Sequence, residues 1–124
     1  MGKILVKPGV DFGTNLAFAG AHILEVIKQL VATYDFDLTI TSARDGVHSG
    51  PDDPHKTGEA YDLRTHDLNS AQVGRLLNDL QTALYHDPRR FYAFLESPDT
   101  PNVHIHVQRR NGTTYSILDY LNNA

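Results

Sequence analysis

The stretch Arg90-Phe-Tyr-Ala-Phe-Leu-Glu96, followed after a turn with Pro and Asp by Asn102-Val-His-Ile-His-Val-Gln108, decides the fold of this chain. β-Branched and aromatic residues are frequent in both segments, so we predict two strands that pair as an antiparallel hairpin. Alternate side chains of a strand share a face. His104 and His106 therefore point into one cleft, and the apolar residues around them turn to the core. In the first strand, Phe91 and Ala93 form one alternating pair and Tyr92 and Phe94 the other. We expect one of these pairs to lie in the core and the other to border the cleft.

Working outward from the hairpin, hydrophobic spacing predicts two helices and further strands. The predicted elements are a helix at 14–34 capped by Thr14 or Asn15, a strand at 37–42, a loop at 45–57, a strand at 60–64, a helix from Asp67, Asn69 or Ser70 to about Tyr85, and a last strand with a short helical turn within 113–121. Apart from that last segment, the order is α-β-β-α-β-β. We therefore expect an α+β fold, with helices packed on one face of a mainly antiparallel sheet.

The bulk composition excludes several classes of protein. The chain has 124 residues, which suits one domain over 1–124, and it has no cysteine, which excludes disulfides and thiolate metal sites. The 11 basic and 15 acidic residues give a net charge of −4 without a Lys/Arg stripe, so we expect no nucleic-acid partner. No apolar run suits a membrane span, and the N-terminus lacks the apolar core of a signal peptide. We expect a monomer, and the compartment stays open.

Two histidine-containing segments carry the chemistry. His55 and Asp62 begin and end the segment His-Lys-Thr-Gly-Glu-Ala-Tyr-Asp, and His104 and His106 alternate in the second hairpin strand. Together they supply two or three imidazoles and one carboxylate, the ligand set of a catalytic zinc that keeps an open position for water. Gly58 allows a tight turn between the first two residues. Neither motif is specific alone, but their combination predicts a zinc hydrolase.

The pattern His55-x-x-Gly-x-Ala-x-Asp62 followed by His104-x-His106 resembles the motif pair of the zinc D-Ala-D-Ala carboxypeptidase family. This family also takes in L-alanyl-D-glutamate endolysins, vancomycin-resistance dipeptidases and the hedgehog signalling domain. The resemblance implies a hedgehog-like or DD-peptidase-like fold in which His55, Asp62 and His106 bind Zn2+. It also implies that His104 lies beside the metal as a hydrogen-bonding or proton-handling residue.

A third segment extends the resemblance. Thr41-Ser-Ala-Arg44 resembles the family's strand ending Thr-Ser-x-x-Arg. The resemblance implies that Arg44 faces the substrate carboxylate or the developing oxyanion. It also implies a substrate class, the stem peptides of bacterial peptidoglycan. The enzyme would then act either as a D-Ala-D-Ala carboxypeptidase or as an L-Ala-D-Glu endopeptidase.

Two positions depart from the family pattern. The serine of the full first motif, Ser-x-His-x-x-Gly-x-Ala-x-Asp, is Asp53 here. Many relatives also carry a glutamate a few residues before the last zinc histidine, whereas positions 101–103 read Pro-Asn-Val. The general base is therefore His104, or else Glu96 or Asp99 reaches in from the hairpin.

Two other interpretations use the same residues. A hedgehog-like domain can keep its zinc for structure and recognition without hydrolysis, and the missing acidic residue favours such a recognition module. Two histidines and one carboxylate also form the facial triad of non-haem iron enzymes. Those enzymes normally need a larger barrel and a pocket for a cosubstrate, so the zinc peptidase remains the prediction.

Overall fold

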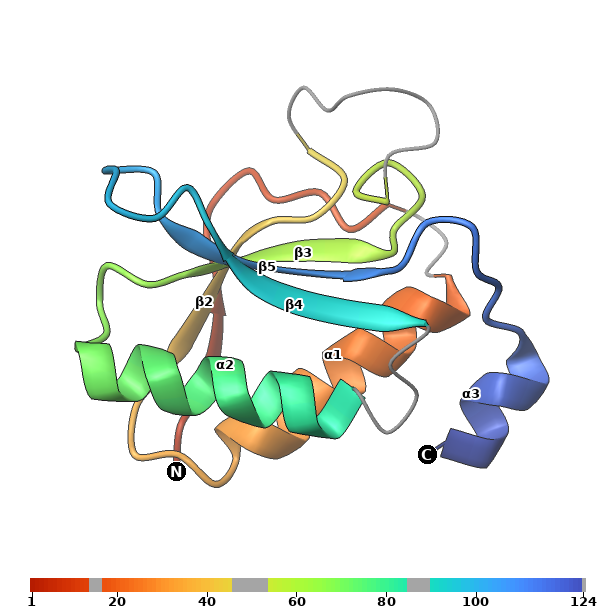
Figure 1. The fold of residues 1–124 in the computed structure, drawn as a ribbon, viewed down its shortest axis with the longest axis horizontal. Coiled ribbons are helices and arrows are strands. Elements are labelled where there is room, and N and C mark those ends of the chain that lie inside the picture. Colours follow the sequence, from red (N-terminus) through yellow and green to blue (C-terminus); the bar gives the residue numbers. More distant parts are fainter. Residues whose placement is uncertain (14–16, 46–53, 85–89, 124) are drawn as a thin grey trace.

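The computed structural model describes residues 1–13, 17–45, 54–84 and 90–123. Figure 1 shows how its elements are arranged. These elements are β1 (Ile4–Val6), α1 (Phe18–Val31), β2 (Leu38–Ser42), β3 (Ala60–Arg64), α2 (Ser70–Leu84), β4 (Phe91–Glu96), β5 (His104–Arg109) and α3 (Ile117–Asn123). The strands form one five-stranded sheet in the order β1-β2-β3-β5-β4. None of the described helices is long and apolar enough to cross a bilayer.

The sheet is mainly antiparallel, as predicted, but one edge is parallel. β2 pairs with β3, β3 with β5 and β5 with β4 in antiparallel register, and the β4–β5 hairpin is the one predicted from the sequence. At the edge, Ile4–Val6 pairs with Leu38–Ile40 in parallel, and α1 makes the crossover between these strands. The sequence prediction missed β1, because a strand of three residues is too short to show an alternating pattern.

Helices α1 and α2 lie side by side against one face of the sheet (Figure 1). Ile23 and Ile27 of α1 and Leu76 and Leu80 of α2 are fully buried with the inward side chains of the strands. Each such burial contributes about 1.5–3 kcal/mol to folding. These contacts confirm that α1 and α2 cover one face of the sheet. Helix α3 packs near the start of α1.

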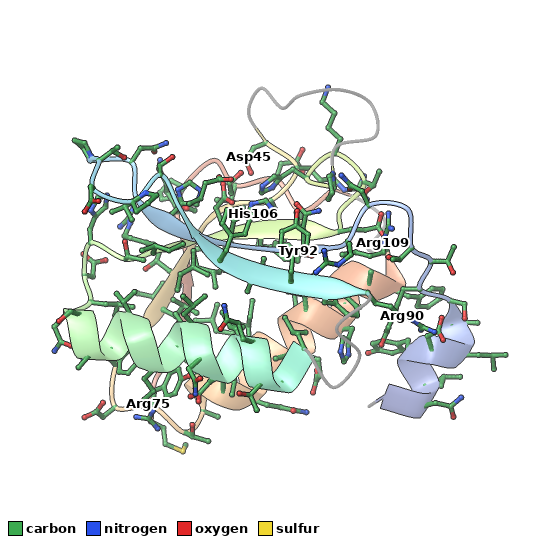
Figure 2. All side chains as sticks on the ribbon, in the orientation of Figure 1. Asp45, Arg75, Arg90, Tyr92, His106 and Arg109 are labelled. Atoms are coloured by element: carbon green, nitrogen blue, oxygen red, sulfur yellow. The ribbon has the colours of Figure 1, made fainter. Side chains whose placement is uncertain are left out.

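The other face of the sheet carries the predicted cleft residues. Phe91 and Ala93 are the core pair of β4, so Tyr92 projects to the opposite face. There its ring lies 6.4 Å from the His106 ring, and Figure 2 shows the two side chains close together above the strands. The alternation of β5 is confirmed too, since Ile105 is fully buried on the helix side.

Helix α1 is shorter than predicted. It begins at Phe18, because Ala17 still has an extended backbone with ψ of 150°. It ends at Val31, and the chain then turns before β2. The predicted caps Thr14 and Asn15 lie outside the described residues.

Helix α2 begins after Asn69, one of the three predicted caps. Gln72 donates its backbone N–H to Asn69 Oδ1 at 2.8 Å, and Asn69 donates its backbone N–H to Gln72 Oε1 at 2.9 Å. This reciprocal pair is a capping box, which satisfies two backbone donors at the start of the helix. The predicted end at Tyr85 lies outside the described residues, which include the helix to Leu84.

The last strand predicted within 113–121 is wrong. Residues 113–116 form no strand, and α3 begins at Ile117. Arg109 donates to the Thr113 carbonyl oxygen, so this carbonyl is already engaged by a side chain. Ser116 then donates its backbone N–H to Asp119 Oδ2 at 2.8 Å, a contact typical of a helix start.

Candidate metal centre

Two neighbouring strands place the predicted ligands together on the sheet face opposite α1 and α2. Asp62 of β3 lies directly across from His106 of β5. Two residues away on β5, His104 lies between Arg64 of β3 and Glu96 of β4. Because every second side chain shares a face, these five side chains project from the same side of the sheet. The antiparallel register therefore brings together residues that are far apart in the sequence.

The loop before β3 supplies the third ligand, His55. Its backbone turns at Gly58, whose φ of 77° favours glycine. The loop packs so closely on α1 that a Cβ at Gly20 would lie 2.0 Å from the Gly58 carbonyl oxygen. At its end, Glu59 forms a bidentate ion pair with Arg109 of β5. A glycine on α1 and an ion pair on β5 thus hold the loop in place.

Three donor atoms converge in the resulting cluster. Asp62 Oδ1 lies 3.2 Å from His55 Nε2 and 3.0 Å from His106 Nδ1. The two imidazole nitrogens lie 3.3 Å apart. His55 and His106 are buried, and the Asp62 side chain is 17% exposed. The three residues are close enough to hold one metal ion.

Hydrogen bonds on the far side of each ring fix which nitrogen can bind a metal. His55 donates its Nδ1–H to the Ala43 carbonyl oxygen at 2.8 Å, so its Nε2 lone pair faces the cluster. His106 donates its Nε2–H to Gln108 Oε1 at 2.7 Å, so its Nδ1 faces the cluster. Gln108 in turn donates its side-chain N–H to the Arg109 carbonyl oxygen, which sets the orientation of its amide. Metal-binding histidines are normally held in this way.

The spacing of the cluster matches a tetrahedral metal site. Zinc ligands lie about 2.0–2.1 Å from the ion, so the ligand atoms of a tetrahedral site lie about 3.3 Å from one another. The three separations between His55, Asp62 and His106 are 3.0, 3.2 and 3.3 Å. With both rings neutral, three lone-pair-bearing atoms face one another without a proton between them. A cation between these atoms removes the mutual repulsion, so the donor set fits a metal.

The electrostatics of the metal-free cluster agree with this arrangement. Burial by itself raises the pKa of Asp62, but hydrogen bonds from His106 and His55 outweigh it and hold that pKa well below the usual carboxyl range. Burial lowers the pKa of His106, whereas the hydrogen bonds with Asp62 and Gln108 and the charge on Asp62 raise it above 6.5 overall. Asp62 thus stays anionic and attracts either a proton on His106 or a metal.

His104 lies next to this cluster and bonds to Glu96. It donates Nδ1–H to the Asn102 carbonyl oxygen at 2.7 Å, and its Nε2 lies 2.8 Å from Glu96 Oε1. The same Nε2 is 3.5 Å from Asp62 Oδ1. The sequence predicted that Glu96 or Asp99 could reach the site from the hairpin if His104 is not the general base. In the structure, Glu96 contacts His104 directly. Asp99, another named residue, is exposed in the hairpin turn with φ of 63°.

Arg44 contacts the loop that carries His55. Its guanidinium packs against Gly13 and Gly58, where an added Cβ would lie 2.7 Å and 2.8 Å from its side-chain atoms. Arg44 also donates to the Thr57 carbonyl oxygen at 3.5 Å. These contacts hold its guanidinium between Gly13 and the loop that carries His55. Asp53, the position of the motif serine, lies outside the described residues.

Sequence reasoning missed the groups that hold the two imidazoles. Gln108 could have been found, because strand alternation puts it on the same face as His106. The Ala43 carbonyl oxygen could not, since a backbone acceptor carries no sequence signal. Comparison with known proteins adds no further assignment: no family model, curated protein or solved structure matches the chain.

Proposed function

We propose that this chain is a zinc-dependent peptidase that hydrolyses stem peptides of bacterial peptidoglycan. The substrate is a D-Ala-D-Ala terminus or an L-Ala-D-Glu bond, as the resemblance of the two motifs implies. One observation carries the proposal: His55, Asp62 and His106 have tetrahedral spacing, and an acceptor outside the cluster engages the far nitrogen of each imidazole, so that His55 Nε2 and His106 Nδ1 face Asp62. Three protein ligands leave one position open, which is typical of catalytic zinc.

Each residue of the cluster has a distinct part in this proposal. His55, Asp62 and His106 hold the ion. Zinc in such a site lowers the pKa of a water molecule toward about 7 and polarises a carbonyl group. The Asp62 carboxylate neutralises part of the charge on the ion, and burial of the two histidines excludes competing water.

His104 and Glu96 handle protons in this proposal. Because the Asn102 carbonyl oxygen engages His104 Nδ1, proton exchange takes place at Nε2, which lies between Glu96 and Asp62. Glu96 Oε1 lies 2.8 Å from that nitrogen, orients the ring and can share a proton with it. The pair can take a proton from the attacking water and return it to the leaving amine. Glu96 supplies the acidic group that positions 101–103 lack, which weakens the case for a non-catalytic recognition module.

The test is peptide hydrolysis by the zinc-loaded protein. We expect the wild type to cleave a peptidoglycan stem peptide, and we expect His104→Ala and Glu96→Gln to keep their zinc while turnover falls about 10²–10⁴-fold. Asp99→Asn is the matched control: it removes a carboxylate from the same hairpin, and asparagine tolerates the positive φ at this position. Turnover of the control should equal that of the wild type.

The same assay separates the alternatives. Stoichiometric zinc without cleavage of any stem peptide would reject the peptidase and favour a recognition module. Bound iron with oxygen-dependent turnover would instead indicate a facial-triad enzyme. If His104→Ala and Glu96→Gln both hydrolyse as fast as the wild type, the proton-handling role given to this pair is wrong.

A further inference from the structure

A pocket of about 290 Å³ opens on the sheet face directly beside the candidate metal centre. Asp62 and His104 form part of its wall, so it is continuous with the cluster. Its remaining wall comes from the neighbouring strands and the hairpin turn, including Lys7, Arg64 and His66. This volume lies near the lower limit of small-molecule sites, which suits a short terminal group rather than a long chain.

The wall of this pocket is positively charged once a metal is bound. Asp62 is its one carboxylate among the described residues, and the proposed ion neutralises that charge. Lys7 and Arg64 then remain as fixed cations, although the protein as a whole has a net charge of −4. Arg64 pairs with Asp67 only across 3.7 Å at the surface, where such contacts are weak.

The two cations come from segments far apart in the sequence and line the same pocket. Lys7 follows β1, the parallel edge strand, and Arg64 ends β3 opposite His104. Thr41 of β2 adds a hydroxyl to the wall between them. Convergence of a lysine, an arginine and a hydroxyl at one end of a reaction centre is typical of a carboxylate-binding site.

Arg44 is not part of this wall. Its guanidinium packs against Gly13 and Gly58 instead. The carboxylate-binding role that the family resemblance implied for Arg44 therefore has a second set of candidates in the pocket wall.

We infer that Lys7 and Arg64 form a subsite for a substrate carboxylate on the His104 side of the metal centre. The inference rests on the proposed peptidase function and names the feature of the peptide that this side recognises. The carboxylate is the free C-terminus of the peptide, because the pocket suits a short terminal group. Arg64 can bind such a group through two parallel N–H donors, and Lys7 adds a point charge.

The test compares peptides that differ only in a carboxylate. KM and kcat are measured for a stem peptide with a free C-terminus, for its C-terminal amide, and for an amidated peptide that keeps an internal acidic residue. In Lys7→Gln/Arg64→Gln, we expect the KM ratio of amide to free acid to fall about tenfold or more, because recognition of the charge is lost. A rise of KM for the amidated peptide with the internal acidic residue, and not for the free acid, would overturn the C-terminal assignment. Lys28→Gln, which removes an exposed charge from α1, is the control.

A binding measurement keeps this test independent of turnover. N-acetyl-D-alanine and its amide are titrated into the zinc-loaded protein, and the Arg64 guanidinium signal is followed by nuclear magnetic resonance. We expect the acid to shift this signal and the amide not to do so. Equal responses to both, or equal binding of the acid by the double variant, would overturn the inference. If the wild type binds the acid but cleaves no peptide, the subsite stands and the proposed function fails.

Discussion

Two clusters of side chains share the Asp62 carboxylate and differ in spacing and burial. The first joins Asp62 to His55 and His106, whose side chains are 6% and 8% exposed. The second joins it to His104 and Glu96, and the Glu96 side chain is 41% exposed. Both clusters contain carboxylate and imidazole groups close enough to hold a metal ion. Residue type alone therefore does not distinguish them.

The distances distinguish the two clusters. Ligand atoms around a tetrahedral zinc lie about 3.3 Å apart, whereas a hydrogen bond between charged groups spans about 2.7–2.9 Å. The first cluster has separations of 3.0, 3.2 and 3.3 Å, and the closest pair in the second is 2.8 Å apart. The separations of the first cluster lie closer to those of a zinc site, and the His104–Glu96 pair of the second has the length of a hydrogen bond between charged groups. Burial agrees, because a metal ligand gains from exclusion of water and a proton donor needs access to substrate.

The shared residue gives the largest predicted effect. Asp62→Asn removes the charge that both clusters use, with little change in shape. Loss of a residue that only hydrogen-bonds to a metal ligand lowers affinity by up to roughly 100-fold. We expect a larger fall in zinc affinity here, because Asp62 is itself a proposed ligand. We also expect the pKa of His106 to fall, because Asp62 raises it. Calorimetric zinc titration and histidine titration by nuclear magnetic resonance measure the two effects. Unchanged zinc affinity in this variant would contradict the ligand assignment.

The pH dependence gives the next effect, and it has opposite signs for metal binding and folding. The pKa of His106 lies above its ordinary value of 6.5 in the metal-free fold. Zinc must displace the His106 proton, so affinity falls toward about tenfold per pH unit below that pKa. In the metal-free protein the same raised pKa stabilises the fold fully below pH 6.5, and this contribution is lost as pH rises through the folded pKa.

Zinc titrations between pH 5.5 and 8, with thermal melting of the metal-free protein at each pH, measure both trends. A histidine with the ordinary pKa would place the midpoint of the fall in affinity at pH 6.5. Because the pKa of His106 is raised, we expect the midpoint above this value. Equal zinc affinity at both ends of the range would show that His106 is not a ligand.

A smaller effect is expected from the group that holds His106. Gln108→Leu leaves the ligand in place but removes the acceptor of its Nε2–H. We expect zinc affinity to fall about 10–100-fold while the bound form keeps the same ligands. The matched control is Gln81→Leu, since Gln81 also donates to a backbone carbonyl but lies on α2, far from the cluster. Equal affinity losses in both variants would indicate a general loss of stability instead.

The sequence predicted the fold best where patterns were long. Helix α2 and the β4–β5 hairpin have strong periodicity, so their presence and inward faces were predictable. The β1 strand was missed because its three residues depend on pairing with β2. The strand expected near Thr113 was wrong: the Arg109 side chain engages the Thr113 carbonyl oxygen there, a contact that no local pattern reveals.

For the candidate site, the sequence predicted which residues meet but not how they are held. His55, Asp62 and His106 converge as expected, because the motifs fix a loop and two strands. From the sequence, the general base could be His104, Glu96 or Asp99. The pairing of Glu96 with His104 across β4 and β5, which the sequence does not reveal, favours Glu96 over Asp99 as the acidic partner. The Lys7–Arg64 pocket was not predictable, since it depends on the unexpected β1 edge.

The most direct test of the central claim is the zinc content of the purified, reconstituted protein by inductively coupled plasma mass spectrometry. We measure wild type, His106→Ala and His104→Ala side by side. The two-cluster account predicts near-stoichiometric zinc in the wild type and in His104→Ala, and almost none in His106→Ala. A wild type without zinc after reconstitution, or a His106→Ala variant that keeps it, would contradict the account.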